Sequence, residues 1–169
     1  PPPLPIKLII ALPRPKMLRR IFRNISMLGV KEIYLINTYK VEKSFWQSQL
    51  LENKTYENYF LEGLSQGKDT LLPTLHIRKR FKPFVEDELP LIIKDTIPIV
   101  AHPGPYPGFP QGIKDPMSLA IGPEGGFTDY EINLLTKNGM MAHHCGARIL
   151  RMETAVVSLL SQHNSFLNS

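Results

Sequence analysis

A glycine-rich turn lies between an apolar stretch and a polar, helix-like stretch in "AIGPEGGFTDYEI", residues 120–132. We call residues 121–127 the elbow. Glycine lets a backbone approach a ligand closely, and the free amides at a helix start attract polar groups. The chain has no GxGxxG and no GxxxxGK[ST] motif, so neither a dinucleotide nor a nucleoside triphosphate is indicated. From this segment alone, a ligand loop around the carboxylate of Glu124 and a plain tight turn are equally good interpretations.

A second candidate segment is "HHCGARILRMETA", residues 143–155. Arg148 and Arg151 stand three residues apart, between a predicted turn at Gly146 and a predicted helix. Two guanidinium groups in one loop suit the fork-like hydrogen bonds that recognise phosphate. The alternative is that both arginines form structural ion pairs with Glu124 and Glu153.

The same segment contains His143, His144 and Cys145 in a row. Adjacent residues of a strand point to opposite faces and rarely bind one metal ion together, and no second Cys/His pair has zinc spacing. We therefore expect no metal. Cys145 is the only cysteine, so an intramolecular disulfide is excluded, and no triad context marks it as a nucleophile.

The charge of the chain points to an anionic partner. Its 169 residues carry 20 basic and 15 acidic side chains, a net charge of +5. Two clusters hold much of the basic charge: Arg14, Lys16, Arg19, Arg20 and Arg23, then Arg78, Lys79, Arg80 and Lys82. Nucleic-acid binding and two merely solvated faces are both compatible with them. The apolar runs are too short to span a bilayer and no secretory signal pattern is present, so we expect a cytoplasmic protein.

The periodicity of apolar residues predicts alternating strands and helices. The proline-rich residues 1–5 are expected to be a linker or a frayed end, and residues 6–169 one domain. Strands are predicted at 6–13, 32–37, 74–77, 97–104, 117–122 and from 140, and helices at 15–28, 43–51, 55–66, 83–89, 128–138 and 153–164. This alternation predicts an α/β fold, a mostly parallel sheet with helices on both faces.

The helix after the elbow has the clearest start signal. Thr128 and Glu131 form a capping box, Phe127 can pack on Ile132, and Gly139 ends the helix. Ligands of open parallel sheets bind outside the carboxyl ends of the strands. The loops 101–108, 121–127 and 144–151 follow such ends, so we expect them to form the site.

These residues also carry a resemblance to a known family. "IGPEGGFTDYEI" followed by "CGARILRMETA", with "AHPG" and "LGVKEIYLI" before them, resembles the RsmE family of ribosomal RNA uridine-N3 methyltransferases, within the SPOUT superfamily. The resemblance implies a trefoil knot in the C-terminal part, S-adenosyl-L-methionine as cofactor, a homodimer, and methylation of N3 of a uridine in small-subunit (16S) ribosomal RNA.

The resemblance also implies roles for individual residues. The cofactor is expected to contact His102, Pro103, Gly104, Ile121, Gly122, Pro123, Gly125, Gly126, Cys145, Gly146, Ile149 and Leu150. Arg148 and Arg151 are expected to stabilise the developing uridine anion or hold its phosphate. Glu124 is expected to orient the arginines or to interact near the sulfonium. RNA is expected to contact Arg19, Arg20, Arg23, Arg78, Lys79, Arg80 and Lys82. No general base is assigned: His144 lies close in sequence to the ligand loops, but no histidine is a convincing base.

Departures from the family pattern leave alternatives open. The family usually has an N-terminal barrel of PUA type that helps to hold RNA, and this chain is expected to begin after it, as a fragment or as a protein without it. Met27 replaces an acid, and Asp69 stands where an arginine is usual. The alternatives are the same fold acting on another ribosomal or transfer RNA nucleotide, and a catalytically idle RNA-binding module.

Overall fold

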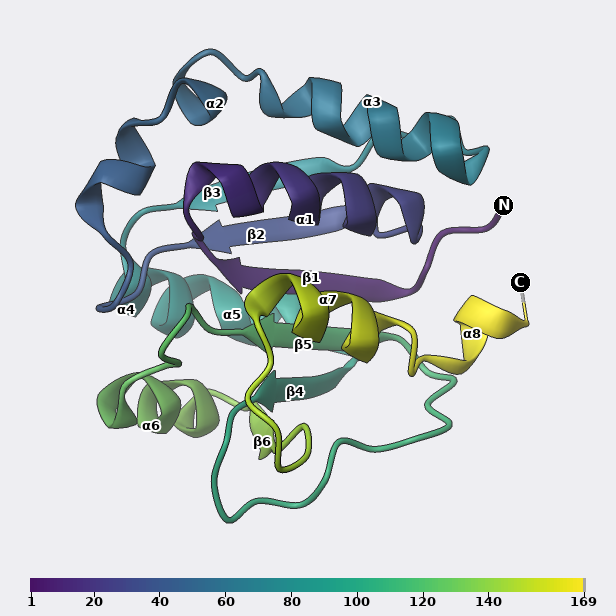
Figure 1. Ribbon diagram of the computed structural model, residues 1–169. Helices are drawn as coiled ribbons and strands as arrows, with labels where there is room; N and C mark the ends of the chain where they lie inside the picture. Colours follow the sequence, from purple (N-terminus) through teal and green to yellow (C-terminus); the bar gives the residue numbers. More distant parts are fainter. Residues whose placement is uncertain (169) are drawn as a thin grey trace.

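A six-stranded parallel sheet forms the centre of the computed structural model, which describes residues 1–168 (Figure 1). The strand order is β3-β2-β1-β5-β4-β6, and every neighbouring pair is parallel. The strands are β1 (Ile6–Ala11), β2 (Glu32–Ile36), β3 (Thr74–Arg78), β4 (Ile97–Ala101), β5 (Met117–Ile121) and β6 (Met141–His143). The predicted α/β class with a parallel sheet is confirmed.

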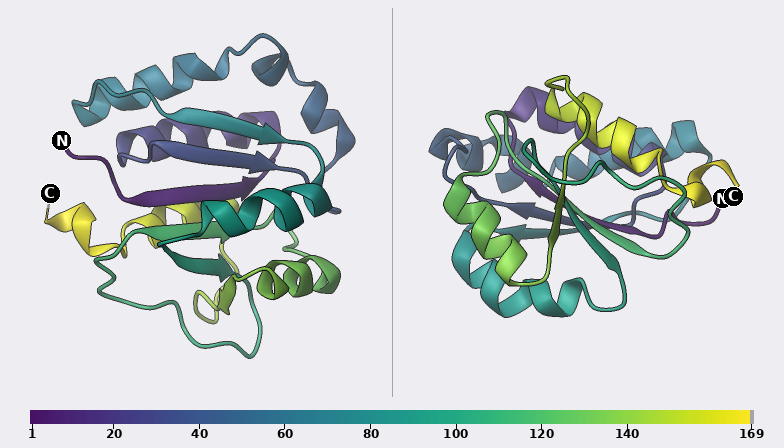
Figure 2. Two further views of the ribbon diagram at one scale, coloured as in Figure 1. Left: turned by 180° about the vertical axis from the view of Figure 1, so that it is seen from behind. Right: turned by 90° about the horizontal axis from the view of Figure 1, so that it is seen from below.

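Helices cover both faces of the sheet, as the view from below shows most plainly (Figure 2). One face carries α1 (Pro15–Met27) and α7 (Met152–Leu160), and α3 (Tyr56–Gly67) packs on α1. The other face carries α4 (Phe81–Pro83), the π-helical η2 (Phe84–Glu88), α5 (Leu89–Ile92) and α6 (Asp129–Lys137). The 3₁₀ turn η1 (Lys43–Gln47) with α2 (Gln49–Glu52) follows β2, and α8 (Asn164–Leu167) ends the described chain.

The core is divided by the sheet into two apolar clusters. Along β1, Leu8 and Ile10 belong to the cluster under α1 and α7, and Ile9 belongs to the cluster under α5 and α6. This is the two-residue alternation of a strand that is buried on both faces. All five residues of β5 are buried, so the ends of β1 and β5 have fixed positions.

Proline and serine change two of the predicted helices. Residues 43–51 divide at Ser48, whose extended backbone separates η1 from α2. The short helix predicted at 83–89 runs instead from Phe81 to Ile92 and widens to a π-helical turn before Pro90. Proline has no N–H and its ring displaces the carbonyl four residues earlier, which accounts for the wider turn.

The two ends of the described chain lie close together (Figure 1). Pro1 to Pro3 are exposed, whereas Leu4 is buried and its N–H donates to the carbonyl of Gly29 at 2.9 Å. Gly29 has φ +92°, and a Cβ there would lie 3.3 Å from the nitrogen of Leu4, so glycine ends α1 as predicted. The helix predicted at 153–164 ends at Leu160, and the buried ring of His163 caps α8 by accepting from the N–H of Ser165.

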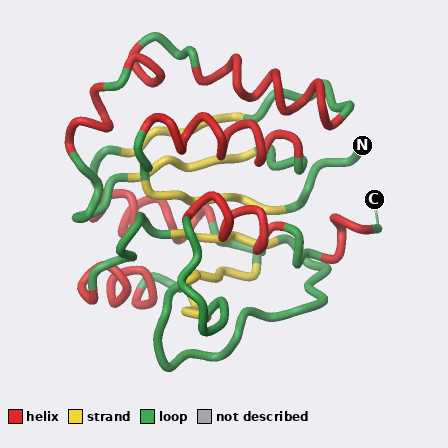
Figure 3. Tube along the Cα trace, in the orientation of Figure 1, coloured by secondary structure: helices red, strands yellow, loops and turns green. Residues whose placement is uncertain are grey.

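A long loop joins β4 to β5. The chain between Ala101 and Met117 has no helix or strand, apart from an isolated bridge at Gly108 (Figure 3). We call residues 102–116 the β4 loop. Within residues 1–168, no helix is long and apolar enough to cross a membrane.

Candidate functional site

The predicted loops meet at the carboxyl edge of the sheet. Ala101 of β4 pairs in register with Ile121 of β5 and with His143 of β6, so the chain leaves all three strands at one level. The β4 loop and residues 144–151, which we call the β6 loop, are also joined directly. The N–H of His102 donates to the carbonyl of His143 at 3.0 Å, and the N–H of His144 donates to the carbonyl of Pro107 at 3.0 Å.

The elbow closes against the ring of His102. Gly125 and Gly126 have φ values of +87° and +79°, which side chains rarely tolerate, and the N–H of Gly126 donates to the carbonyl of Pro123 at 2.8 Å. A Cβ on Gly126 would lie 3.6 Å from Cε1 of His102. The predicted capping box of Thr128 and Glu131 is confirmed, and it fixes the direction in which the elbow enters α6.

The imidazole of His102 has a polar atom without a partner. Its Nδ1 is buried and accepts or donates no hydrogen bond within residues 1–168. Burial lowers the pKa of His102 and the ammonium of Lys40 lowers it further, against the opposing carboxylate of Asp129. The ring is therefore neutral at pH 7. Because an unpaired buried polar group is costly, the free nitrogen is suited to a ligand that pairs with it.

A fourth loop, which was not among the predicted ligand loops, also reaches the elbow. It comprises residues 37–41, which follow β2, and we call it the β2 loop. The Nζ of Lys40 donates to the carbonyl of Gly125 at 2.6 Å, and the N–H of Tyr39 donates to Oε2 of Glu131 at 2.9 Å. Glu131 is only 3% exposed, so this contact is firmly held. The predicted parallel sheet could have indicated this loop, because the carboxyl end of β2 lies at the same edge as the ends of the other parallel strands.

The β6 loop exposes its two arginines. Within residues 1–168, neither Arg148 nor Arg151 pairs with a carboxylate; Glu153 instead lies 3.6 Å from Arg20, and Glu124 is exposed. The structural ion pairs considered as the alternative are therefore not formed. Ile149 is fully exposed between the two arginines. Arg151 immediately precedes α7, so its backbone position is set by the start of that helix.

The thiol of Cys145 is half-buried, and burial raises its pKa. Burial therefore disfavours the thiolate, which is the nucleophilic form of cysteine. Beside this thiol, a groove of about 290 Å³ extends between the β4 loop, the β6 loop and α7. It is lined by Gly108, Phe109, Gln111, His144, Cys145, Gly146, Ser158, Leu159 and Gln162.

Among residues 1–168, no three His, Cys, Asp or Glu side chains gather as a metal site would need.

Most of the basic residues predicted to contact RNA already have partners. In the first cluster, Arg20 pairs with Glu153. Arg23 pairs with Glu62 and also lies over the ring of Tyr59. In the second cluster, Arg78 donates to both carboxylate oxygens of Glu88 at 2.8 and 2.9 Å, and Lys82 lies 3.8 Å from Glu86. The remaining members are Arg19, over Tyr59 at 5.9 Å, Lys79, over Trp46 at 5.9 Å, and the exposed Arg80.

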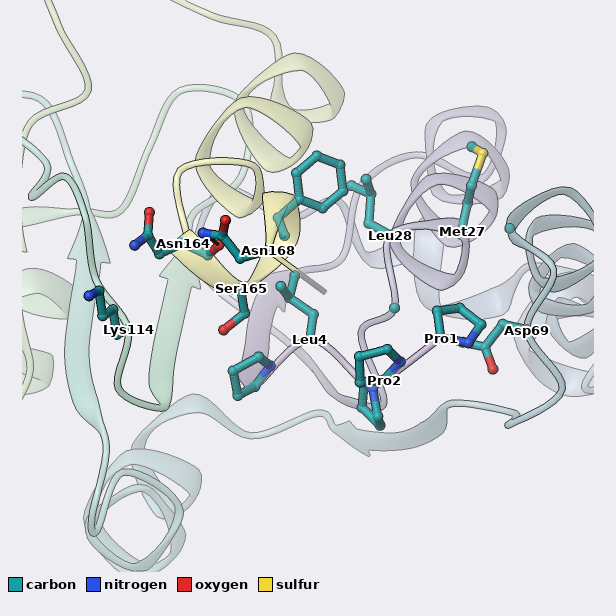
Figure 4. A pocket seen from close by; sticks show the side chains of 15 residues that line it. Pro1, Pro2, Leu4, Met27, Leu28, Asp69, Lys114, Asn164, Ser165 and Asn168 are labelled. Atoms are coloured by element: carbon teal, nitrogen blue, oxygen red, sulfur yellow. Dashed lines mark hydrogen bonds between the residues drawn. The ribbon is translucent and has the colours of Figure 1, made fainter.

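The two departures from the family pattern lie at the opposite, amino edge of the sheet. Met27 and Asp69 line a groove of about 670 Å³ between the chain ends, shown in Figure 4. Asp69 accepts a hydrogen bond from the N–H of Leu71 at 3.0 Å and pairs with Lys31 at 2.5 Å, and these contacts lower its pKa. Asp69 is therefore a structural residue, away from the ligand loops.

The fold and these loops define an α/β domain whose candidate ligand loops lie outside the carboxyl ends of parallel strands, where such domains bind ligands. The sequence profile of the RNA methyltransferase domain family matches residues 1–164. The chain belongs to that family.

Curated relatives agree with this assignment. Ribosomal RNA small subunit methyltransferase E of Treponema pallidum is 33% identical over 159 residues, which are 89% of this chain and 58% of the relative. The protein named Ribosomal RNA small subunit methyltransferase E 1 of Borreliella burgdorferi is 28% identical over 161 residues, 89% of this chain and 63% of the relative. The chain thus spans about three-fifths of the length of these relatives.

Solved structures share the fold. The ribosomal RNA small subunit methyltransferase E of Neisseria gonorrhoeae bound to S-adenosyl methionine superposes with a TM-score of 0.78 at 18% identity, over 94% of this chain and 65% of that one. The SpoU methyltransferase AviRb of Streptomyces viridochromogenes superposes with a TM-score of 0.56 at 17% identity, over 92% of this chain and 58% of that one. At these identities the likeness shows the fold alone. The SPOUT superfamily and its trefoil knot stay predictions.

Proposed function

We propose that this domain transfers a methyl group from S-adenosyl-L-methionine to N3 of a uridine in small-subunit ribosomal RNA. The observation that carries the proposal is the unpaired, buried Nδ1 of His102 beside the glycine elbow, at the edge of the sheet from which the β6 loop with its exposed arginines also starts. The relatives named above support the reaction and the class of RNA.

The residues at the carboxyl edge fit this cofactor. Gly126 leaves open the space beside His102 that a Cβ would occupy, and no atom lies within 4 Å of where a Cβ of Gly146 would be. The cofactor contacts expected from the family resemblance lie on the three joined loops: His102, Pro103, Gly104, Ile121, Gly122, Pro123, Gly125, Gly126, Cys145, Gly146, Ile149 and Leu150. When bound, S-adenosylmethionine supplies an electrophilic methyl group on a positively charged sulfur.

The arginines would act on the uridine. N3 carries a proton at neutral pH, and negative charge spreads to the neighbouring carbonyl oxygens as that proton leaves. Arg148 and Arg151 are exposed, with no carboxylate partner among residues 1–168, so their guanidinium groups are free to donate to those oxygens or to the phosphate. Glu124 is exposed on the elbow and would orient a guanidinium group.

A pair of measurements tests the proposal. Titration calorimetry with S-adenosylmethionine should give one site per chain. Small ribosomal subunits that lack the modification should then acquire one methyl group, located by mass mapping at N3 of a uridine. If S-adenosylmethionine binds but the methyl group is found on another nucleotide, the cofactor part of the proposal stands and the substrate is a different nucleotide. No cofactor binding would favour an idle RNA-binding module.

We further propose that the chain acts as a homodimer. Ile149 is fully exposed and Leu150 is exposed beside it, in the loop that carries the catalytic arginines. A second copy covering these side chains would remove apolar surface from water and complete the site. Sedimentation equilibrium measures this directly, and an Ile149→Asp variant should shift the chain toward monomer. Since the proposed substrate is ribosomal RNA, the proposed compartment is the cytoplasm.

A further inference from the structure

An exposed tyrosine stands on the β2 loop, next to the proposed methyl-transfer site. The side chain of Tyr39 is 85% exposed. Its neighbours on both sides hold fixed contacts: Thr38 is buried, and the Nζ of Lys40 donates to Gly125. A large aromatic ring is thus displayed to solvent at the edge where the ligand loops meet.

The backbone that carries this ring is firmly anchored. Besides the bond from the N–H of Tyr39 to buried Glu131, the N–H of Val41 donates to the carbonyl of Thr38 at 3.1 Å, and Val41 is buried. The N–H of Asn37 donates to the carbonyl of Arg78 at 3.1 Å. The ring of Tyr39 is therefore presented on a rigid support, and a ligand that stacks on it need not first order the loop.

Cations without acidic partners lie on the adjoining loop. Because Ile36 pairs with Arg78, the residues that follow β3 run beside the β2 loop. Lys79 lies over the ring of Trp46, whose Nε1 donates to Oδ1 of Asn37 at 2.9 Å. Within residues 1–168, no carboxylate pairs with Lys79 or with exposed Arg80. These two positive charges are thus available to an anionic ligand.

We propose that Tyr39, with Lys79 and Arg80 on the neighbouring loop, forms a contact for single-stranded RNA at the entrance to the methyl-transfer site. An unpaired base stacks on the ring of Tyr39, and the two cations hold the phosphates next to it. Stacking on aromatic rings together with backbone contacts from cations is how unpaired RNA is bound, since every base has a π face. Paired RNA would hide its bases and could not use the ring. The contact rests on the proposed function, because it feeds the RNA toward the same edge.

The test measures RNA and cofactor separately. The probe is a dye-labelled oligouridylate, followed by fluorescence anisotropy. Tyr39→Ala should weaken binding by about five- to a hundredfold, the usual effect of losing one stacked base. Tyr39→Phe keeps the ring and should stay within about twofold of the parent. Lys137→Ala, which removes an exposed charge at the other end of α6, controls for non-specific charge effects.

The outcomes separate this contact from the proposed reaction. If the parent chain binds S-adenosylmethionine but Tyr39→Ala and Tyr39→Phe bind oligouridylate equally well, the contact is wrong and the reaction stands. If the parent chain binds no oligouridylate, the contact is also wrong. If the parent chain binds RNA through Tyr39 but binds no S-adenosylmethionine, the contact stands and the methyltransferase proposal fails. Equal melting curves verify that the exposed position tolerates the changes.

Discussion

The Nζ of Lys40 donates a hydrogen bond to the carbonyl oxygen of Gly125 at 2.6 Å, across 85 positions of the sequence. The two residues follow different strands, β2 and β5, which are separated in the sheet by β1. The bond therefore spans one strand at the carboxyl edge. It holds the glycine elbow in place from the side opposite to His102, so the elbow is supported on both sides.

Lys40→Met should loosen the elbow and weaken S-adenosylmethionine binding by about three- to tenfold, the effect of one hydrogen bond. Lys43→Met removes a nearby exposed lysine and should leave the affinity unchanged. Calorimetric titration measures both variants. Equal affinities for Lys40→Met and the parent would show that the elbow needs no support from the β2 loop.

Gly126→Ala should abolish most cofactor binding, because its Cβ points at the ring of His102 and fills the space between them. Gly112 is a matched control: its φ is +71° and no atom lies within 4 Å of where its Cβ would be. Both substitutions place alanine at positive φ and should cost about 1 kcal/mol of stability. Only Gly126→Ala should lose the cofactor. If both variants bind alike, the cofactor lies elsewhere.

Arg151→Ala should lower the single-turnover rate of methyl transfer by about a hundredfold while changing cofactor affinity little, because charge develops on the uridine only in the transition state. Arg151→Lys should restore part of the rate, since a point charge cannot reproduce the guanidinium fork. Rapid-quench methylation of small subunits, beside a cofactor titration, gives both quantities. A parallel loss of rate and affinity would make Arg151 a cofactor ligand.

The salt dependence of RNA binding should identify which cations contact phosphates. Replacing Lys79 and Arg80 together by alanine should reduce the slope of log K against log salt by about 1.4, or about 0.7 per phosphate contact on a single strand. Replacing Arg20 and Arg23 together should change it less, because Glu153 and Glu62 already neutralise them. The opposite order of effects would place the RNA on α1.

The burial of His102 should make the native state sensitive to mild acid. Its pKa is lowered from the ordinary 6.5, so the unfolded chain takes up a proton before the folded chain does as the pH falls. This group therefore leaves the free energy of unfolding unaffected above the ordinary histidine pKa, and it lowers that free energy as the pH falls through this pKa. Urea unfolding at pH 8 and pH 5.5 should show a larger acid-induced loss in the parent than in His102→Asn. Equal losses would mean that the ring is not desolvated.

Local signals in the sequence were sufficient to predict the helices and strands and to select the three candidate loops. Apolar periodicity located all six strands, the capping box located the start of α6, and Gly29 located the end of α1, because these signals depend on neighbours within a few residues. The alternation of strands and helices then required that the loops after β4, β5 and β6 share one edge, since parallel strands end on the same side.

Which charged side chains are free depends on contacts that form only in the folded chain. The sequence presents Arg20, Arg23, Arg78, Lys79 and Arg80 as equivalent cations, and it cannot show that Glu62, Glu88 and Glu153 come from other elements to pair with three of them. The role of Lys40 was hidden for the same reason. Its partner is a backbone carbonyl 85 positions away, and such a contact exists only after the strand order has brought the β2 loop to the elbow.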